Sequence, residues 1–373
     1  MEKQEKILKK IQSCQAHGNE GQLGKKNNDE CYTSIQTILD ELSHWAVLGK
    51  FQGKRIVCPC DWDIVEGSDI YSITIEYDPE FKVIGNNVFK GAKVSYDLFD
   101  HFFEDKVVLK KIVLKEDEVE EFLKDKLICN FIRIFTQMAR AWGIKSITAS
   151  GYNPAIDKGI RFQDVDYSKY DICVTNPPFS LYREFMNSIL DKIDFIILAP
   201  FLNRGSATCG LPLLLKQAYL GFGVHLNAEF QNPTKDNKLN VKYVACDWLT
   251  SFSEAQEERN NRHFKSGVLY KDYKDEWAEM PCMTMKDGTH PIRISASTYP
   301  EDYDGWMFGS IGVLDNLDQS EYEWYGTHFS AYLNSDLKQS PFNGKISTHI
   351  IHQTKDGSKS FGGIVFRKKK RFI

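Results

Sequence analysis

A short apolar segment that ends in two prolines constrains the fold of this chain more than any other feature. Residues 172–175 (Ile-Cys-Val-Thr) are β-prone, and Asn176, Pro177, Pro178 and Phe179 follow them directly. Two successive prolines remove two backbone N–H donors and fix two φ angles, so a strand must end there. Because ligands bind at the carboxyl ends of strands in open α/β sheets, we expect a binding site on this loop.

Segments with strand-like and helix-like patterns alternate over the first two thirds of the chain. The β-prone runs are residues 55–60, 146–149, 172–175 and 195–199, and helical spacing occurs in 35–42, 131–142 and 181–193. This alternation predicts an α/β fold with a parallel sheet. We expect Gly143 to end the second helix and Ser180 to cap the third.

A change of pattern near residue 252 predicts two domains. Beyond it the sequence becomes charged, aromatic and rich in turns, with Pro281, Pro291 and Pro300. We therefore expect a catalytic domain over residues 1–252 and a second domain over 253–373.

Charge is distributed unevenly along the chain, whose net charge is −4. Residues 64–128 hold 15 Asp and Glu against nine Lys and Arg, which is typical of an acidic insertion and makes contact with DNA there unexpected. Residues 338–373 hold nine Lys and Arg against one Asp, and they end in the basic run 367–371. Such a tail suits nucleic-acid phosphates, although a solvated terminus needs no partner.

The composition favours a globular protein of the cytoplasm. Hydrophobic residues make up 42% and charged residues 26% of the chain, and no apolar run is long enough to span a membrane. The N-terminus lacks the apolar core of a signal peptide. The nine cysteines are scattered without a CxxC pair, so we expect reduced thiols and no metal site.

The loop after the central strand suits chemistry on an amino group attached to a flat ring. The side-chain oxygen of Asn176 and the carbonyl of Pro177 can each accept a hydrogen bond from such an amino group. Phe179 can stack on the ring. The second proline, Pro178, is expected to offer a further carbonyl.

The loop resembles the NPPF/NPPY motif of amino-methyltransferases that use S-adenosylmethionine, chiefly the DNA adenine N6 enzymes. Further segments are similar, in order, to those of EcoRI-type adenine methyltransferases: NDECYT (28–33), Cys60-Asp61, Asn130-Phe131, NPPFSLYREF (176–185) and DYDG (302–305). The resemblance implies a Rossmann-like class I methyltransferase fold, followed by a C-terminal target-recognition region.

Several residues are candidates for the cofactor pocket. A carboxylate after the first strand is the expected partner for the ammonium or ribose of S-adenosylmethionine, which selects Asp61 and then Asp63. Asp164 precedes the central strand and is placed for the cofactor's adenine. The resemblance adds Cys60 and Asn176, and from the NDECYT segment Asp29, Tyr32 and Thr33. The second strand ends in Ser-Gly-Tyr (150–152), without an acidic residue for the ribose.

The function implied by the resemblance is site-specific methylation of adenine N6 in double-stranded DNA, on a base flipped out of the helix. No metal is required. Methyltransferases acting on RNA adenine or protein glutamine use the same loop, and a non-catalytic DNA-binding homologue would share the fold, so these alternatives stay open. A cognate restriction endonuclease that acts separately stays open as a further partner.

Overall fold

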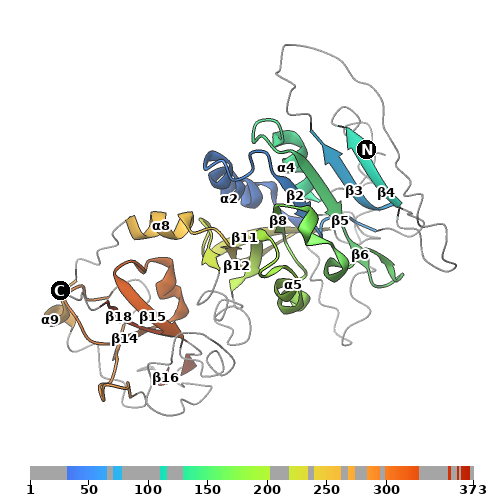
Figure 1. Cartoon of the computed structure of the whole chain (residues 1–373). Coiled ribbons are helices and arrows are strands. Elements are labelled where there is room, and N and C mark those ends of the chain that lie inside the picture. The colour runs from blue at the N-terminus through green and yellow to red at the C-terminus, as the bar shows by residue number, and fades with distance from the viewer. Residues whose placement is uncertain are drawn as a thin grey trace. The chain divides into compact units, whose positions relative to one another are not determined.

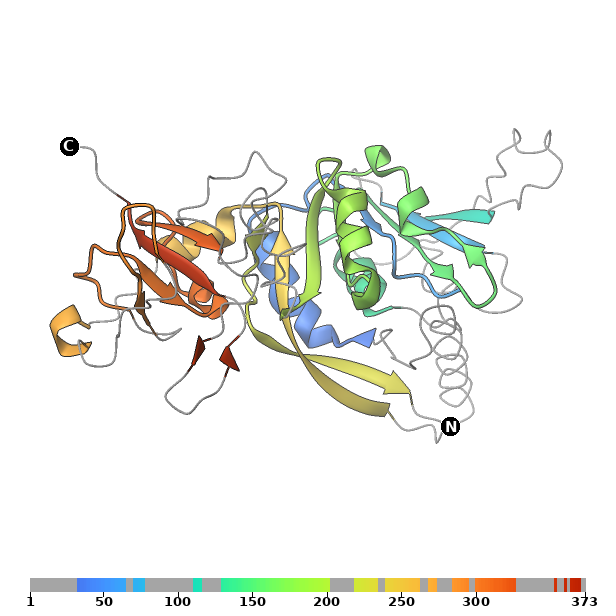
Figure 2. The ribbon, with the colours of Figure 1, turned by 90° about the horizontal axis from the view of Figure 1, so that it is seen from below.

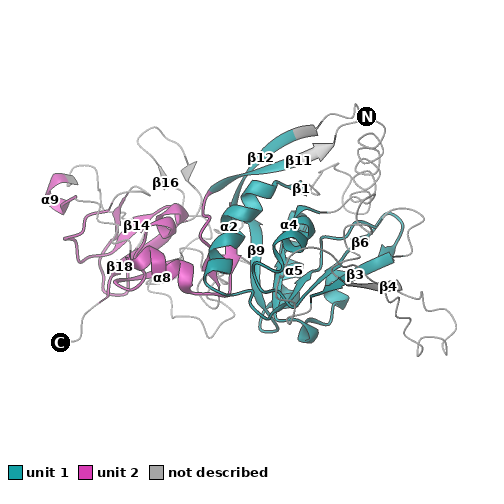
Figure 3. Ribbon diagram, turned by 90° about the horizontal axis from the view of Figure 1, so that it is seen from above, with its two compact units in different colours: residues 1–199, 226–248 teal, residues 200–225, 249–373 magenta. Residues whose placement is uncertain are grey.

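The chain folds into two compact units. The computed structural model describes residues 32–64, 70–77, 110–115, 129–201, 218–233, 239–261, 268–273, 284–294, 299–326, 352–353, 359–360 and 363–369. Unit 1 comprises residues 1–199 and 226–248, and unit 2 comprises 200–225 and 249–373 (Figure 3). These units are defined by their contacts and not by their function. The boundary expected near residue 252 between a catalytic domain and a second domain therefore stays a prediction.

One large mixed sheet runs through unit 1 (Figure 1). Its order is β1-β11-β12-β9-β8-β2-β5-β3-β4, and the short β10, whose residues belong to unit 2, pairs with the last two residues of β12, which also belong to unit 2. The strands are β1 (Tyr32–Thr33), β2 (Arg55–Cys58), β3 (Ile70–Glu76), β4 (Lys110–Lys115), β5 (Ser146–Ser150), β8 (Ile172–Thr175), β9 (Asp194–Pro200), β10 (Tyr219–Leu220), β11 (Leu226–Pro233) and β12 (Leu239–Thr250). The α/β class is thereby confirmed.

The centre of this sheet is parallel and contains a reversal of strand order. Strand β2 pairs in parallel with β5 on one side and with β8 on the other, and β8 pairs in parallel with β9. The chain goes from β2 to β5 on one side and later resumes at β8 on the opposite side. In open α/β sheets, ligands bind at the carboxyl ends of the strands where the order reverses, which here is the edge formed by the loops after β2 and β8.

The acidic segment contributes two strands to this sheet. Strand β3 pairs antiparallel with β5, and β4 pairs in parallel with β3. At the other edge, β11 and β12 form a long antiparallel pair, visible as the yellow-green strands in Figure 2, with β1 paired antiparallel to β11. The described parts of the expected insertion thus extend the sheet.

Three helices of unit 1 follow the predicted periodicity, with changes at their ends. Helix α2 (Ile35–Val47) begins after Ser34, whose side chain accepts a hydrogen bond from the Thr37 N–H. Helix α4 (Asn130–Met138) stops before the expected Gly143, which has a φ of 67° in the turn that follows. Short elements in the same unit are β6 (Tyr152–Asn153), β7 (Lys158–Gly159), and the 3₁₀ turns η2 (Phe162–Asp164) and η3 (Tyr167–Lys169).

The expected cap at Ser180 is wrong. Residues Phe179–Leu181 form the 3₁₀ turn η4, and helix α5 (Tyr182–Ile189) begins after Leu181 without a side-chain cap. The carbonyl of Pro178 accepts a hydrogen bond from the Leu181 N–H at 2.9 Å, which winds this tight turn and delays the helix.

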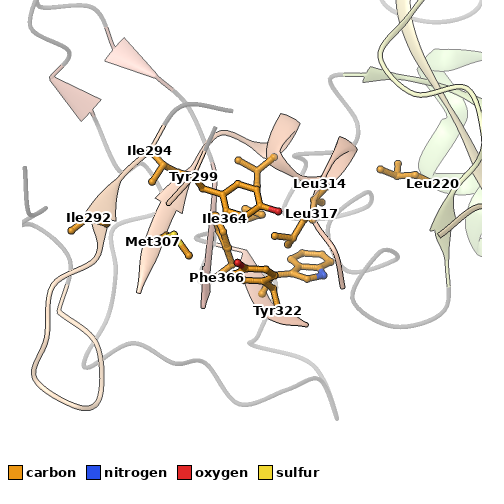
Figure 4. Packing of buried hydrophobic residues seen from close by; sticks show 12 residues of the cluster. Leu220, Ile292, Ile294, Tyr299, Met307, Leu314, Leu317, Tyr322, Ile364 and Phe366 are labelled. Carbon is orange, nitrogen blue, oxygen red and sulfur yellow. The ribbon is translucent and has the colours of Figure 1, made fainter. Parts of the chain in front are cut away.

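Unit 2 has its own sheet and core. The sheet order is β13-β14-β18-β15, and apolar side chains of these strands pack with residues of η5 (Figure 4). The elements are α8 (Glu254–Asn261), α9 (Tyr270–Tyr273), β13 (Ile292–Arg293), β14 (Met307–Gly309), η5 (Ile311–Asp315), β15 (Tyr322–Gly326), the pair β16 (His352–Gln353) and β17 (Lys359–Ser360), and β18 (Ile364–Lys368).

The start of the basic C-terminal run is part of this sheet. Arg367 donates through Nε to Glu323 Oε1 at 2.6 Å, and its guanidinium lies 4.1 Å from the ring centre of Trp306. The ammonium of Lys368 donates to the Glu301 carbonyl, and that of Lys369 to the Gln319 carbonyl. Residues 367–369 therefore stabilise unit 2, whereas 370–373 lie outside the described residues.

We predict that a deletion of residues 367–373 destabilises unit 2, because it removes the end of the interior strand β18. Several hydrogen bonds of about 1 kcal/mol each are lost, which should lower the melting temperature by several degrees. A deletion of residues 370–373, which keeps β18 whole, is the matched comparison and should lower the melting temperature less. Calorimetry of both truncations tests this, and equal melting temperatures would show that the β18 contacts contribute nothing.

Candidate active site

The predicted catalytic loop and the predicted cofactor carboxylate meet at the carboxyl ends of β2 and β8. Asn176 directly follows β8, and Asp61 lies three residues beyond the end of β2. The hydroxyl of Thr175 donates to Asp61 Oδ2 at 2.6 Å. This contact holds the two loops together at the reversal of strand order.

Asp61 is almost fully buried, with 5% of its surface exposed. The Cys129 thiol donates to Asp61 Oδ1 at 3.0 Å, and the Asp61 backbone N–H donates to the Ser150 carbonyl. Burial raises the pKa of Asp61 to about 7, against the lowering effect of the hydrogen bonds from Cys129 and Thr175. Neither Cys129 nor Thr175 could be predicted as a partner from the sequence, because nothing local in the chain connects them to Asp61.

A second carboxylate, Asp63, lies in the same loop. The Tyr32 hydroxyl donates to Asp63 Oδ2 at 2.8 Å. Strand β1, which lies 31 residues earlier in the sequence, therefore contributes to the site. Burial raises the pKa of Asp63 to about 6, and the hydrogen bond from Tyr32 lowers it. The charge of Asp63 in turn raises the pKa of Asp61. Asp63 itself is half-buried, and a cation beside the two carboxylates would favour their ionised forms.

The nitrogen of the Asn176 side-chain amide makes a hydrogen bond, whereas its oxygen makes none. Its Nδ2 donates to the Thr33 hydroxyl oxygen at 3.2 Å, while its Oδ1 is buried and accepts no hydrogen bond. A buried acceptor without a partner costs about 1–3 kcal/mol. Asn176 Oδ1 is therefore ready to accept a hydrogen bond from a ligand.

The rest of the loop offers one proline carbonyl and one half-buried ring. The expectation of two available carbonyls is wrong for Pro178, because its carbonyl already accepts the Leu181 N–H. Pro177 is buried and its carbonyl remains the candidate acceptor. The Phe179 ring is half-buried and meets Phe230 edge to face, with 5.9 Å between ring centres.

The remaining predicted cofactor residues lie in different surroundings. Cys60 is half-buried beside Asp61. Asp164 is exposed in the η2 turn. The buried Phe162 of this turn packs on Phe185 of α5, with 5.3 Å between the ring centres. Asp29 falls outside the described residues. The cofactor contacts of all three stay predictions.

The second strand of the parallel core ends in a close backbone approach. A Cβ on Gly151 would lie 1.9 Å from the Trp62 carbonyl oxygen, so glycine is required where this turn passes the loop of Asp61. Next to it, the hydroxyl of Ser150 is buried and has no hydrogen-bond partner. Ser150 thus places a polar group where the sequence offers no acidic residue.

Within the described parts of the chain, no group of three or more His, Cys, Asp or Glu side chains could hold a metal ion. None of the described helices is long and apolar enough to cross a membrane.

Comparison with known families identifies the chain. The model of a family described as "Adenine-specific methyltransferase EcoRI" matches residues 160–369. The chain belongs to this family. It is an adenine-specific DNA methyltransferase of the EcoRI type. Comparison with curated proteins and with solved structures gave no match.

The matched residues include the loop from Asn176 to Phe179 and the DYDG segment, so the suspected family is confirmed. The match begins after Asp61 and Thr33 in the sequence. The roles of individual residues in this EcoRI-type enzyme therefore rest on the geometry described above.

We predict that replacing Asp61 by Asn stabilises the protein more at pH 8 than at pH 4.5. Because burial raises its pKa, the folded protein keeps a proton that the unfolded chain loses between about pH 4 and 7. The free energy of unfolding therefore falls as pH rises through this window. A neutral amide of the same shape removes that loss, so the melting temperature at pH 8 should rise by about 5–10 °C relative to wild type.

Calorimetry at the two pH values measures the effect. Asp164→Asn is the matched control, because it removes an exposed carboxylate and should change little at either pH. An Asp61→Asn variant whose shift is the same at both pH values would contradict the raised pKa.

Proposed function

We propose that this enzyme transfers a methyl group from S-adenosylmethionine to the N6 amino group of an adenine flipped out of double-stranded DNA. The observation that carries the proposal is the buried, unbonded oxygen of Asn176, which lies on a loop joined to a pair of desolvated carboxylates. The site would thus pair a hydrogen-bond acceptor for an amino group with two carboxylates that suit a cation.

A Rossmann-like class I fold is proposed for the catalytic core. Support comes from the parallel strands β5-β2-β8-β9 with their reversal of order between β2 and β8. The edge strands β11 and β12 form an antiparallel pair beside β9. The candidate residues lie at the reversal, where this class of sheet binds its ligands.

The carboxylates fit the charged end of the cofactor. When bound, S-adenosylmethionine supplies an activated methyl group. Asp61 and Asp63 would face its ammonium, and a cation there would favour their ionised forms. The Ser150 hydroxyl and Cys60 border the same loop, and Asp164 would receive the adenine of the cofactor.

The loop after β8 would prepare the target amino group. Asn176 Oδ1 and the Pro177 carbonyl would each accept a hydrogen bond from one N–H of the amino group, which would direct the nitrogen lone pair toward the methyl group that the cofactor supplies. One amino proton would pass to water as the new N–C bond forms and the thioether leaves. Holding reactants in such an arrangement contributes about 7–11 kcal/mol to catalysis. The amino group attacks directly, so the proposed reaction uses no thiol nucleophile. Cys173 is unsuited to that role, because it is buried within β8 and burial raises the pKa of its thiol.

Residues 253–373 are proposed to read the DNA. The family match extends through residue 369, and residues 338–373 carry a net charge of +8. A duplex base cannot reach a deep loop without leaving the stack, so base flipping is part of the proposal. We place the enzyme in the cytoplasm, because all five described cysteines are free thiols.

We predict that Asn176→Ala abolishes methyl transfer and leaves the dissociation constant of S-adenosylmethionine nearly unchanged. The alanine keeps the fold but removes the acceptor for the target amino group. Single-turnover assays with labelled cofactor should show a loss well beyond tenfold, which is about 1.4 kcal/mol of barrier. Calorimetric titration of the cofactor measures the binding.

Asp61→Ala is the reciprocal variant for this experiment. It should weaken cofactor binding first, because it removes a charge facing the ammonium. If Asn176→Ala keeps more than a tenth of the wild-type rate, Asn176 does not hold the target amino group. An unchanged cofactor dissociation constant in Asp61→Ala would remove Asp61 from the pocket.

We predict that Phe179→Ala weakens binding of the flipped base, whereas Phe179→Tyr keeps most of it. A stacked base contributes about 1–3 kcal/mol. With 2-aminopurine at the target position, the alanine complex should be brighter, because stacking on Phe179 quenches fluorescence. The contact with Phe230 requires a melting curve as a control. A destabilised variant with unaltered fluorescence and normal activity per folded molecule would assign Phe179 to packing alone.

A further inference from the structure

We propose that Thr33 is a positioning residue that orients the Asn176 amide for catalysis. Its hydroxyl oxygen lies 3.2 Å from Asn176 Nδ2 and accepts a hydrogen bond from it. The inference rests on the proposed role of Asn176 and assigns Thr33 to the methyl-transfer step, away from the cofactor contact expected from the sequence.

Orientation matters because the two ends of an asparagine amide have opposite hydrogen-bonding character. The oxygen only accepts and the nitrogen only donates, and a half-turn of the side chain exchanges them. If the nitrogen faced the target, two amino groups would meet as donors. With Nδ2 held by Thr33, Asn176 Oδ1 is the atom left without a partner, and it is buried.

Thr33 itself is held in a set place, so its hydroxyl oxygen is presented to Asn176 Nδ2 at a fixed position. Only 2% of its surface is exposed, and it pairs with Phe230 in the antiparallel ladder of β1 and β11. Its carbonyl accepts a hydrogen bond from Asn130 Nδ2 at 2.8 Å. The first residue of α4 and an edge strand thus fix the backbone that carries the hydroxyl.

The two residues of β1 divide between the two halves of the site. Successive side chains of a strand point to opposite faces. The Tyr32 hydroxyl accordingly bonds Asp63 on the cofactor side, and the Thr33 hydroxyl bonds Asn176 on the target side. One short strand therefore couples the cation pocket to the catalytic amide.

The test is the isosteric substitution Thr33→Val, which removes the hydroxyl and keeps the shape. Because Asn176 then has no partner for its nitrogen, the single-turnover rate at saturating cofactor should fall about ten- to a hundredfold. The dissociation constant of S-adenosylmethionine should stay within about twofold. Thr33→Ser restores the hydroxyl and should recover most of the rate.

Thr148→Val is the matched control. Thr148 is also buried in the large sheet, and its hydroxyl bonds Thr74, away from the catalytic loop. This variant should keep the wild-type rate per folded molecule. If Thr33→Val folds poorly, the comparison of Thr33→Ser with Thr33→Ala isolates the hydroxyl in the same way.

Three outcomes would overturn the proposal. An unchanged rate in Thr33→Val means that the contact is idle. Weaker cofactor binding with a normal rate at saturation means that Thr33 is a cofactor ligand. Equal losses in Thr33→Val and Thr148→Val, with lowered melting temperatures, mean a structural role. An active Asn176→Ala variant would instead contradict the proposed role of Asn176 in methyl transfer. An inactive Asn176→Ala variant together with a fully active Thr33→Val variant would contradict the orienting role of Thr33 alone.

Discussion

The hydrogen bond from Thr175 to Asp61 is the contact on which the candidate site depends. It joins the loops after β2 and β8, which are neighbours at the centre of the sheet. At the opposite ends of the same strands, Arg55 and Asp171 form a bidentate pair with both N–O distances at 3.0 Å. The strand pair is thus joined at both ends, and the contacts of Asp61 with Cys129 and of Asn176 with Thr33 position the residues beyond it.

Fixed strands allow the site to keep groups in unfavourable states. Asp61 and Asp63 have raised pKa values because burial removes them from water, and Asn176 Oδ1 has no partner. Each of these features costs stability. A ligand that brings a cation and an amino group would relieve all three, so the stability that these groups cost the protein would be regained on binding.

The sequence predicted the local features of this arrangement better than the distant ones. Strand β8 and the loop after it followed from two prolines, and the place of Asp61 after β2 followed from the strand pattern. The contact between Thr33 and Asn176 spans 143 residues, and a two-residue strand such as β1 has no periodicity to detect. The prediction that Ser180 caps the helix was wrong because the Pro178 carbonyl accepts the Leu181 N–H. This bond forms a 3₁₀ turn before the helix, and the sequence pattern does not show it.

Unit 2 shows why net charge alone does not locate a DNA-binding surface. Arg367 belongs to the most basic stretch of the chain, yet its guanidinium lies against Glu323, Asp287 and the ring of Trp306. A cation that is already paired with carboxylates displaces few counterions from DNA and adds little to non-specific affinity. The net charge of residues 338–373 therefore overstates the charge available for phosphates. Contacts that discriminate between sequences must come from side chains that reach base edges, which depends on their geometry and not on the sum of charges.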